Sequence, residues 1–312
     1  MSLRSYAAVC FAVVSFTACS KPAESPQPAA TPAPAAAPTG PGPLTAGWTA
    51  SDGIAAPESV YVDPQSGWVF SSQIVGMPGD RDGNGRIAKL TGDGKVVKAD
   101  WVTGLNAPKG LRACNGTLWT SDIDEVVGID IASGTVTSRV KVPNAQFLND
   151  VECASDGTVY VSDMMANRII TVKDGMPSVF AEGEQLEYPN GILLDGDRLI
   201  VGGWGKPKPD FSTDVPGRLF ALDLKTKKKT LITPKPFSNT DGLESDGHGG
   251  YITSDNPAGK LYHVSATGEA KVVREFMPGI ADIAFVADKN IVVIPHMPQN
   301  QVAAYDLTDN LK

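Results

Sequence analysis

Four residues whose side-chain oxygens could bind a metal occupy equivalent positions of a sequence repeat. Glu58, Asn149, Asn190 and Asp241 each stand at the start of a hydrophobic segment that leads into a Gly- or Asp-containing turn. If the fold brings these starts together, two carboxylates and two amide oxygens converge on one point. Hard divalent cations prefer such ligands, and Ca²⁺ accepts flexible coordination of low ligand charge better than Mg²⁺ does. We therefore expect a divalent metal site, with calcium as the favoured ion.

The same position in the two remaining segments holds Lys109 and Ala281. Lys109 places a cation among acidic groups, where it could form an ion pair with Glu58 or Asp241 and compete with the metal. It could also point aside, or bind the substrate and stabilise an oxyanion. We rank the structural ion pair first among these alternatives.

The elements that must position these residues form an internal repeat. The segment starts are 51, 40, 41, 51 and 40 residues apart along the chain. Periods of about 40 to 50 residues with four short strands each are typical of β-propeller blades. β-Branched and aromatic residues dominate the second strand of each repeat, as strands prefer. These second strands are predicted around residues 68–70, 117–119, 159–161, 198–201, 251–253 and 291–293.

The sixth repeat ends too early to supply a fourth strand, because the sequence stops at Lys312. Residues 48–54 precede the first repeat and are otherwise unassigned. Pairing this segment with the sixth repeat would close the ring and remove open sheet edges. The predicted fold class is therefore all-β, a six-bladed β-propeller whose ring is closed by an N-terminal strand.

In a propeller the second strands return to the face at which the innermost strands begin. We expect their ends to form a wider ring of Ser72, Asp122, Asp163, Trp204, Asp255 and His296. The three aspartates recur in Ser-Asp words and are interpreted as architectural residues. Trp204, followed by a long insertion to Val215, and His296 are the candidates for contact with a substrate.

In the short motifs around the strand starts, the chain resembles the regucalcin (senescence marker protein)/gluconolactonase family of six-bladed propellers. The matching motifs are Pro57-Glu58, Asn149-Asp150, Pro189-Asn190-Gly191 and Asp241-Gly242, and the similarity spans residues 57–306. The resemblance implies that Glu58, Asn190 and Asp241 bind the metal. It also implies that Asn149 holds water or substrate beside the metal.

The resemblance further implies a function, a metal-dependent hydrolase of a small-molecule lactone or related ester. Asp241 would act as ligand and general base, with Asn149 as its catalytic partner on the substrate side. The family often has an arginine two residues before this asparagine, where this chain has Phe147, so we expect a more apolar substrate than a sugar lactone. The alternative is a non-catalytic propeller that binds a small ligand or a protein partner.

The N-terminal residues are typical of an exported lipoprotein. Arg4 precedes an apolar stretch too short to span a bilayer, and the Phe16-Thr17-Ala18-Cys19 word follows it. We expect a signal peptide over 1–18, lipidation of Cys19, a Pro/Ala-rich tether over 19–44 and the propeller over 45–312. Ser20 after the cysteine favours the outer membrane facing the periplasm, with membrane contact through the lipid only. The alternative is an ordinary signal peptide in which Cys19 has no role.

Charge and cysteine content narrow the remaining possibilities. The formal net charge is −8, and the one basic cluster, at residues 225–229, is short. Such a surface repels phosphate backbones, so we expect no nucleic-acid partner.

Cys114 and Cys153 lie in corresponding strands of neighbouring repeats, and the sequence leaves open whether they form a disulfide or remain two buried thiols. The oligomeric state is not determined by the sequence.

Overall fold

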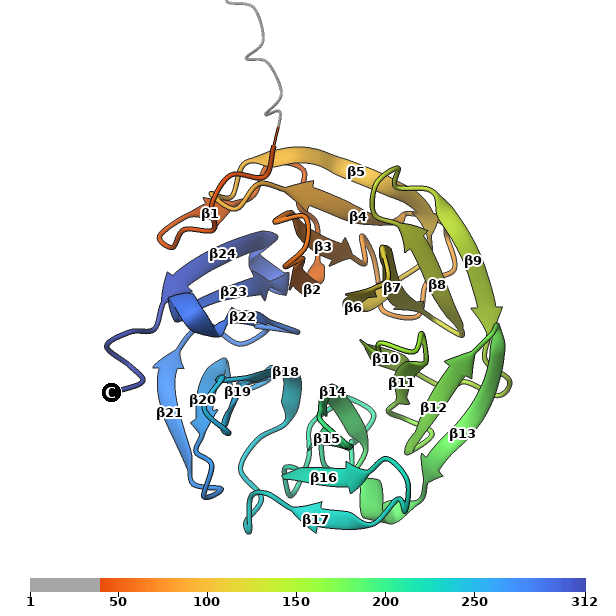
Figure 1. Ribbon diagram of the computed structural model, residues 1–312, viewed down its shortest axis with the longest axis vertical. Coiled ribbons are helices and arrows are strands. Elements are labelled where there is room, and N and C mark those ends of the chain that lie inside the picture. The colour runs from red at the N-terminus through yellow and green to blue at the C-terminus, as the bar shows by residue number, and fades with distance from the viewer. Residues whose placement is uncertain (1–39) are drawn as a thin grey trace, which may run out of the picture. The chain divides into compact units, whose positions relative to one another are not determined.

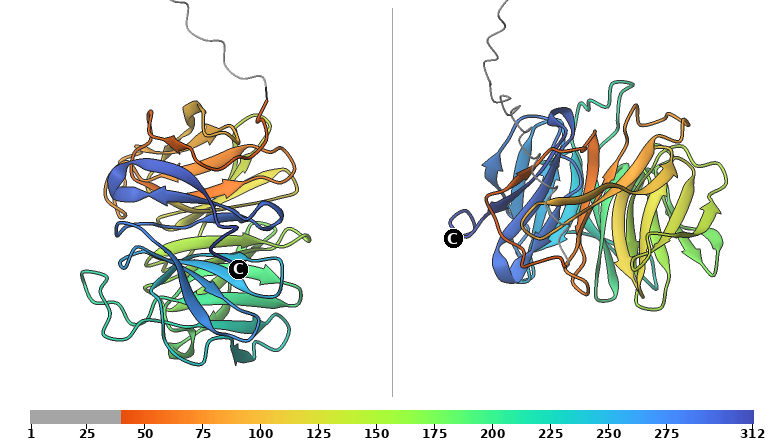
Figure 2. Two further views of the ribbon diagram at one scale, coloured as in Figure 1. Left: turned by 90° about the vertical axis from the view of Figure 1, so that its left-hand side faces the viewer. Right: turned by 90° about the horizontal axis from the view of Figure 1, so that it is seen from above.

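The computed structural model describes residues 40–312, and these residues form a six-bladed β-propeller. Six four-stranded antiparallel sheets are arranged as blades around a central axis (Figures 1 and 2). Each blade begins with its innermost strand at the channel and ends with its outermost strand at the rim. The predicted fold class is confirmed. The predicted signal peptide and Cys19 lie outside the described residues.

The first five blades follow one another along the chain. Blade one has β2 (Pro57–Val62), β3 (Val69–Gln73), β4 (Gly85–Leu90) and β5 (Val96–Leu105). Blade two has β6 (Pro108–Cys114), β7 (Thr117–Asp122), β8 (Glu125–Asp130) and β9 (Val136–Lys141). Blade three has β10 (Leu148–Cys153), β11 (Val159–Asp163), β12 (Arg168–Lys173) and β13 (Met176–Glu182). Blade four follows the short helix η1 (Glu184–Leu186) and has β14 (Pro189–Asp195), β15 (Arg198–Gly203), β16 (Leu219–Asp223) and β17 (Lys229–Leu231). Blade five has β18 (Thr240–Ser245), β19 (Tyr251–Asp255), β20 (Lys260–Val264) and β21 (Ala270–Glu275).

Blade six is completed by the N-terminal part of the propeller, as predicted. It contains β22 (Ala284–Val286), β23 (Ile291–His296) and β24 (Gln301–Asp306), with short helices η2 (Ala287–Lys289) and η3 (Met297–Gln299). Its fourth strand is β1 (Thr49–Ala50), which pairs antiparallel with β24. Ala50 and Ile54 are buried in an apolar cluster with residues of blades six and one. Leu44 also packs against this cluster, so contacts with the propeller begin within the segment predicted to be the tether.

A β-bulge interrupts the innermost strand of five blades at the channel mouth. In blade two, Pro108 pairs with Asp122 and Leu111 with Thr120, so Lys109 and Gly110 together face a single residue of the partner strand. Blades one, three, four and five show the same kind of shift in register. Because a bulge adds one residue to one strand, it changes the direction in which a side chain points. The bulged residues at the mouth are Glu58, Lys109, Asn149, Asn190 and Asp241.

The recurring Ser-Asp words stabilise this mouth, which confirms their interpretation as architectural residues. The aspartates accept backbone N–H groups of the loop that leads into the innermost strand of their own blade. Asp122 accepts from Asn106 and Ala107, Asp163 from Gln146 and Phe147, and Asp255 from Asn239. The serines of two of these motifs accept N–H groups from the bulges themselves, Ser162 from Asp150 and Ser254 from Gly242. Ser72, which is followed by Gln73, accepts the N–H of Ser59 at the corresponding position of blade one.

Below the mouth, a buried arginine crosses the channel. Arg112 of blade two places Nη1 2.8 Å from a carboxylate oxygen of Glu244 in blade five, on the opposite side of the ring. Its Nε lies 3.5 Å from Glu152 of blade three, and its guanidinium lies 5.7 Å from the ring centroid of Tyr61 in blade one. Four blades are thus connected by one side chain and its partners.

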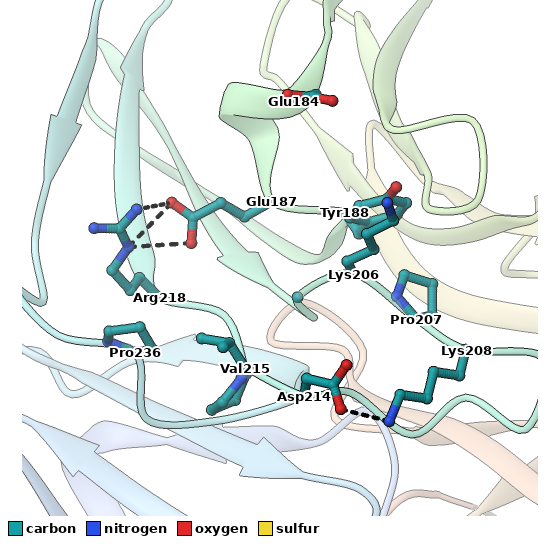
Figure 3. Close-up of a pocket in the computed structure, with 12 residues that line it drawn as sticks. Glu184, Glu187, Tyr188, Lys206, Pro207, Lys208, Asp214, Val215, Arg218 and Pro236 are labelled. Atoms are coloured by element: carbon teal, nitrogen blue, oxygen red, sulfur yellow. Dashed lines mark hydrogen bonds and ion pairs between the residues drawn. The ribbon is translucent and has the colours of Figure 1, made fainter.

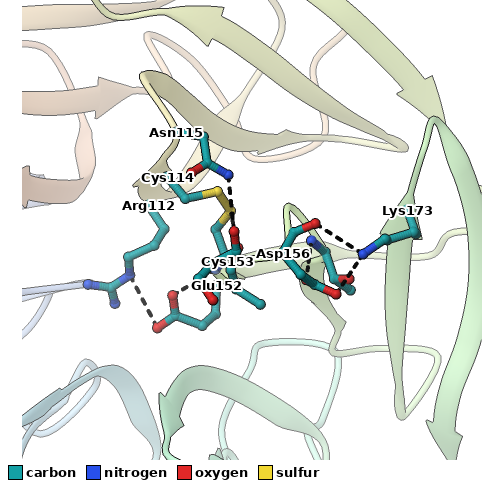
Figure 4. Close-up of a disulfide and its surroundings, with 10 residues drawn as sticks. Arg112, Cys114, Asn115, Glu152, Cys153, Asp156 and Lys173 are labelled. Atoms are coloured by element: carbon teal, nitrogen blue, oxygen red, sulfur yellow. Dashed lines mark hydrogen bonds and ion pairs between the residues drawn. A yellow bond between two sulfur atoms is a disulfide. The ribbon is translucent and has the colours of Figure 1, made fainter.

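Neighbouring blades two and three are also linked covalently. Cys114 at the end of β6 and Cys153 at the end of β10 form a disulfide, with their Cα atoms 5.9 Å apart (Figure 4). The alternative of two free thiols is therefore wrong. The bond lies beside Arg112 and Glu152, at the far end of the innermost strands from the mouth.

Removal of this disulfide should destabilise the propeller without changing its fold. The cysteines are 39 residues apart, and a loop of this length corresponds to about 3 to 4 kcal/mol of lost chain entropy in the unfolded state. We expect the C114A/C153A double variant to unfold at a lower urea concentration than the wild type. Dithiothreitol should lower the wild-type midpoint towards that of the variant and leave the variant unchanged. Equal midpoints of wild type and variant without reductant would contradict this expectation.

Candidate functional site

A pocket of about 310 Å³ opens at the channel mouth. The bulged residues of all five interrupted strands line it, and Trp204 lines it from the end of β15. The structure thus brings together all but one of the residues that the sequence predicted for a site. These residues are Glu58, Lys109, Asn149, Asn190, Asp241 and Trp204.

Two buried oxygen atoms in this pocket lack a protein hydrogen-bond partner within residues 40–312. They are Oε2 of Glu58 and Oδ1 of Asn190, whose residues are 5% and 1% exposed. Burying an unpaired polar atom costs on the order of 1 to 3 kcal/mol, and more when the group is charged. A cation at the mouth would satisfy both atoms. The donor set is therefore chemically suited to a hard metal ion.

Asp241 is held by amide groups on both sides. Its Oδ1 accepts an N–H from Asn190 at 3.1 Å, and its Oδ2 accepts one from Asn256 at 2.8 Å. This contact turns the Asn190 amide so that its nitrogen faces Asp241, and Oδ1 of Asn190 has no partner within the described part of the chain. Asn256 was not found from the sequence, although it directly follows the Ser-Asp word at the end of β19.

Burial dominates the ionisation of the two carboxyl groups at the mouth. It raises the pKa of Asp241 to about 7, against the effect of the hydrogen bonds from Asn256 and Asn190. Burial also raises the pKa of Glu58 well above its usual range, with a further increase from Asp241 and a decrease from Lys109. Two carboxylates close together in a dry site repel each other. A bound cation would relieve this repulsion.

Lys109 does not form the predicted ion pair. Its Nζ donates to the carbonyl oxygens of Pro78 at 3.2 Å and Ala107 at 3.1 Å, and lies 4.8 Å from the ring centroid of Phe147. Across the described part of the chain, none of the salt bridges within 4.0 Å involves Lys109. Burial lowers the pKa of this amine, while Glu58 acts in the opposite direction. The ranking that placed the ion pair first is therefore wrong, because backbone carbonyls take its place.

His296 does not line the mouth pocket, so its predicted contact with a substrate is not supported by its position. Its Nε2 lies 3.0 Å from the hydroxyl of Tyr305, and its ring packs edge-on against Phe276. His296 ends β23 and pairs with Gln301 and Ile280 in blade six, where the ring of Phe276 takes up its side chain.

Apolar side chains form the wall above the polar floor of the pocket. Phe147 and Phe211 contact each other with ring centroids 5.5 Å apart. Further apolar residues of the lining are Ile74, Pro78, Met164, Trp204, Pro257 and Met297. The site therefore combines a few convergent polar groups with a hydrophobic surround, as small-molecule sites commonly do.

A larger pocket of about 680 Å³ lies on blade four, outside the mouth (Figure 3). It contains none of the bulged residues, and most of its charged groups pair with one another. Arg218 lies 2.6 Å from Glu187, and Lys208 lies 2.5 Å from Asp214. We assign the functional site to the smaller pocket. It contains the two buried oxygens that lack partners among the described residues, and the carboxyl groups of Glu58 and Asp241, whose pKa values are raised.

The donor set at the mouth differs from a cluster of acidic, histidine or cysteine ligands. Within 40–312 no group of three or more His, Cys, Asp or Glu side chains has a metal-binding arrangement. The mouth offers two carboxylates together with amide oxygens instead. None of the helices in this part of the chain is long and apolar enough to cross a membrane.

Comparisons with known proteins support the fold of this chain. No protein-family model and no curated protein sequence matches the chain. Among solved structures, a gluconolactonase from Xanthomonas campestris is similar with a TM-score of 0.59 and 15% identity, covering 83% of this chain and 86% of that one. A virginiamycin B lyase from Staphylococcus aureus has a TM-score of 0.53 and 14% identity, covering 80% and 94%. A chain of a nidogen/laminin complex has a TM-score of 0.56 and 13% identity, covering 73% and 92%.

The buried carboxyl groups predict how the stability of the metal-free protein changes with pH. Burial raises the pKa of Asp241 and of Asp150 to about 7 in the folded state, so the folded protein binds more protons than the unfolded chain between about pH 4 and pH 7. Stability from these groups is complete at low pH and is lost as the pH rises through 7. In chelator, the free energy of unfolding in urea should fall by a few kcal/mol between about pH 5 and pH 8.

The D241N variant measures the contribution of Asp241 to the pH dependence of the free energy of unfolding. Its free energy of unfolding should fall less over the same pH interval, because the asparagine does not titrate. An identical pH dependence of wild type and D241N would show that Asp241 ionises normally in the folded protein.

Proposed function

We propose that this protein is a metal-dependent hydrolase of a lactone or related ester, with calcium as the favoured ion. The observation that carries the proposal is the convergence of Glu58, Asn190 and Asp241 on one pocket, where two buried oxygens lack partners among the residues that the structure describes. A gluconolactonase is among the proteins with a similar fold. At 15% identity that likeness concerns the fold, so the functional argument depends on the site itself.

Glu58, Asn190 and Asp241 would hold the metal through their side-chain oxygens. When bound, such an ion polarises a carbonyl group and lowers the pKa of a coordinated water. The chain itself supplies the remaining groups. Glu58 and Asp241 are positioned by bulges in two different blades, so the fold assembles the ligands without a contribution from a flexible loop.

Asp241 is the general base of the proposed reaction. In the metal-free protein burial raises its pKa to about 7, and a bound cation would lower that pKa, so Asp241 would be an ionised carboxylate able to accept a proton near neutral pH. It takes the proton of the attacking water as the oxygen adds to the lactone carbonyl. The proton then passes to the alkoxide oxygen as the ring C–O bond breaks, which gives the hydroxy acid.

Asn149 and Lys109 face the substrate side. The Asn149 side chain lines the pocket and makes no side-chain hydrogen bond to another protein group of the described structure, so its N–H can donate to the substrate carbonyl. Two of the three ammonium hydrogens of Lys109 are directed at Pro78 and Ala107. The third is available to the oxyanion that forms during the addition.

The alternative is a non-catalytic propeller that binds a ligand or a protein, and a nidogen/laminin complex is among the similar folds. The alternative expects Lys109 to fill the mouth with a salt bridge. In this structure Lys109 bonds to backbone carbonyls instead and leaves Glu58 Oε2 unpaired among the described residues. This arrangement favours the hydrolase.

Hydrolysis should depend on both the metal and Asp241. We expect EDTA to abolish lactone hydrolysis by the purified protein and added Ca²⁺ to restore it. D241N should lower kcat by about 100-fold or more, because general bases contribute rate factors of that order. Asp156 is exposed and pairs with Lys173 away from the mouth, so D156N is a matched control that should retain full activity. Activity that withstands both EDTA and D241N would refute the mechanism.

We also propose that Cys19 carries a lipid that anchors the protein at the outer membrane, facing the periplasm. The Cys114–Cys153 disulfide supports export, because disulfides persist in oxidising compartments. In bacteria that express the full chain, wild-type protein should fractionate with membranes and incorporate labelled palmitate. The C19A variant should do neither. Unlabelled wild-type protein in the soluble fraction would instead indicate an ordinary signal peptide.

A further inference from the structure

The long insertion of blade four forms a flap between the two pockets. We define the flap as residues 205–216, which connect β15 to β16. Trp204, Phe211 and Ser212 line the mouth pocket, whereas Lys206, Lys208 and Val215 line the outer pocket shown in Figure 3. One side of the flap therefore forms part of the wall of the site described above.

The flap is fixed both internally and to the body of the blade. Pro207 pairs with Thr213, which makes the flap a short hairpin. The indole Nε1 of Trp204 donates to the carbonyl oxygen of Phe211 at 3.0 Å, and the Asn239 amide donates to Thr213 at 2.9 Å. The tip of the flap therefore has a defined position over the pocket.

Phe211, at this tip, has an unfavourable backbone conformation. Its φ is +63°, in the left-handed region, which costs a residue other than glycine about 1 kcal/mol or more. Glycine or asparagine would adopt this conformation at lower cost. The phenylalanine instead presents a large apolar ring to the pocket, in contact with Phe147.

Several polar groups beside Phe211 are already hydrogen-bonded within the protein. The Ser212 hydroxyl donates to Oδ1 of Asp210 at 2.7 Å, and Asn256 donates to Asp241. Asp210 also lines the pocket and is exposed, so its carboxylate is the charged group on this side of the lining. A polyhydroxylated substrate would find few free partners on this wall and would leave hydroxyl groups unpaired. An alkyl chain has no such requirement. Met164 and Met297, which also line the pocket, have flexible side chains that can adapt to a chain of variable length.

We propose that the mouth pocket selects substrates whose acyl part carries an aliphatic chain, and that Phe211 is the specificity-determining residue. The reaction performed on such a substrate rests on the function proposed above. Recognition of the chain does not, since it depends on the apolar wall of Phe147, Phe211, Met164 and Met297. The substrate class is thus an alkyl-substituted lactone or the corresponding ester.

Binding of non-hydrolysable analogues tests recognition separately from catalysis. The full-length protein is titrated calorimetrically with γ-lactams that carry no chain, a propyl chain or a hexyl chain. We expect each added methylene to tighten binding by roughly fourfold until the pocket is filled, as burial of apolar surface predicts. F211S should lose at least about tenfold in affinity for the hexyl lactam, while F211L should retain most of it.

Val215 provides the matched control on the same flap. It is exposed and lines the outer pocket, so V215A should bind all three lactams as the wild type does. Equal affinity of the wild type for the unsubstituted and hexyl lactams would overturn the proposal. So would a loss of affinity in V215A equal to that in F211S.

Hydrolysis of the matching γ-lactones distinguishes failure of this inference from failure of the proposed function. Chain-dependent lactam binding without hydrolysis of any lactone refutes the hydrolase and supports the role of Phe211. Hydrolysis at equal kcat/KM for all chain lengths, without chain-dependent binding, refutes the role of Phe211 alone. A kcat/KM that rises with chain length in the wild type and in F211L, but not in F211S, supports both.

Discussion

The extra residue in the innermost strands is the constraint on which the site depends. Side chains alternate between the two faces of a regular strand, and in a propeller both faces are packed against neighbouring blades. The bulge inserts one residue at the mouth, so that Glu58, Asn190 and Asp241 project into the pocket while the next apolar residues remain in the core. Hydrogen bonds from the bulges to serines such as Ser162 and Ser254 hold this departure from regular pairing. The bulges therefore both place these polar side chains at the mouth and turn them into the pocket where they can bind a ligand.

The same arrangement leaves buried oxygens without partners inside a well-packed fold. Most buried polar groups in proteins are hydrogen-bonded, and unsatisfied ones require an explanation. Among the described residues, Asn190 and Asn256 satisfy Asp241, and this contact leaves the oxygens of Asn190 and Glu58 unpaired in one pocket. The site thus suits a further cation, because the ammonium group of Lys109 donates to backbone carbonyls and, in the described structure, to neither carboxyl group.

Much of the fold and of this ring was predictable from the sequence, because the repeat period and the strand starts are local features. The spacing of Glu58, Asn149, Asn190 and Asp241 predicted six blades and one convergent site. The partners of Lys109 were not predictable, because they depend on where a neighbouring loop places the carbonyl of Pro78. Distances between side chains on separate blades are also invisible in the repeat, so the disulfide and the contribution of Asn256 emerged only from the three-dimensional structure.

The arginine that crosses the channel makes distant blades depend on one another. The salt bridges that Glu244 and Glu152 form among the described residues are both made with Arg112, which is itself buried. Removing one partner of a buried ion pair leaves an uncompensated charge and is strongly destabilising. A local fault in the innermost strand of blade two would therefore be transmitted to blades three and five.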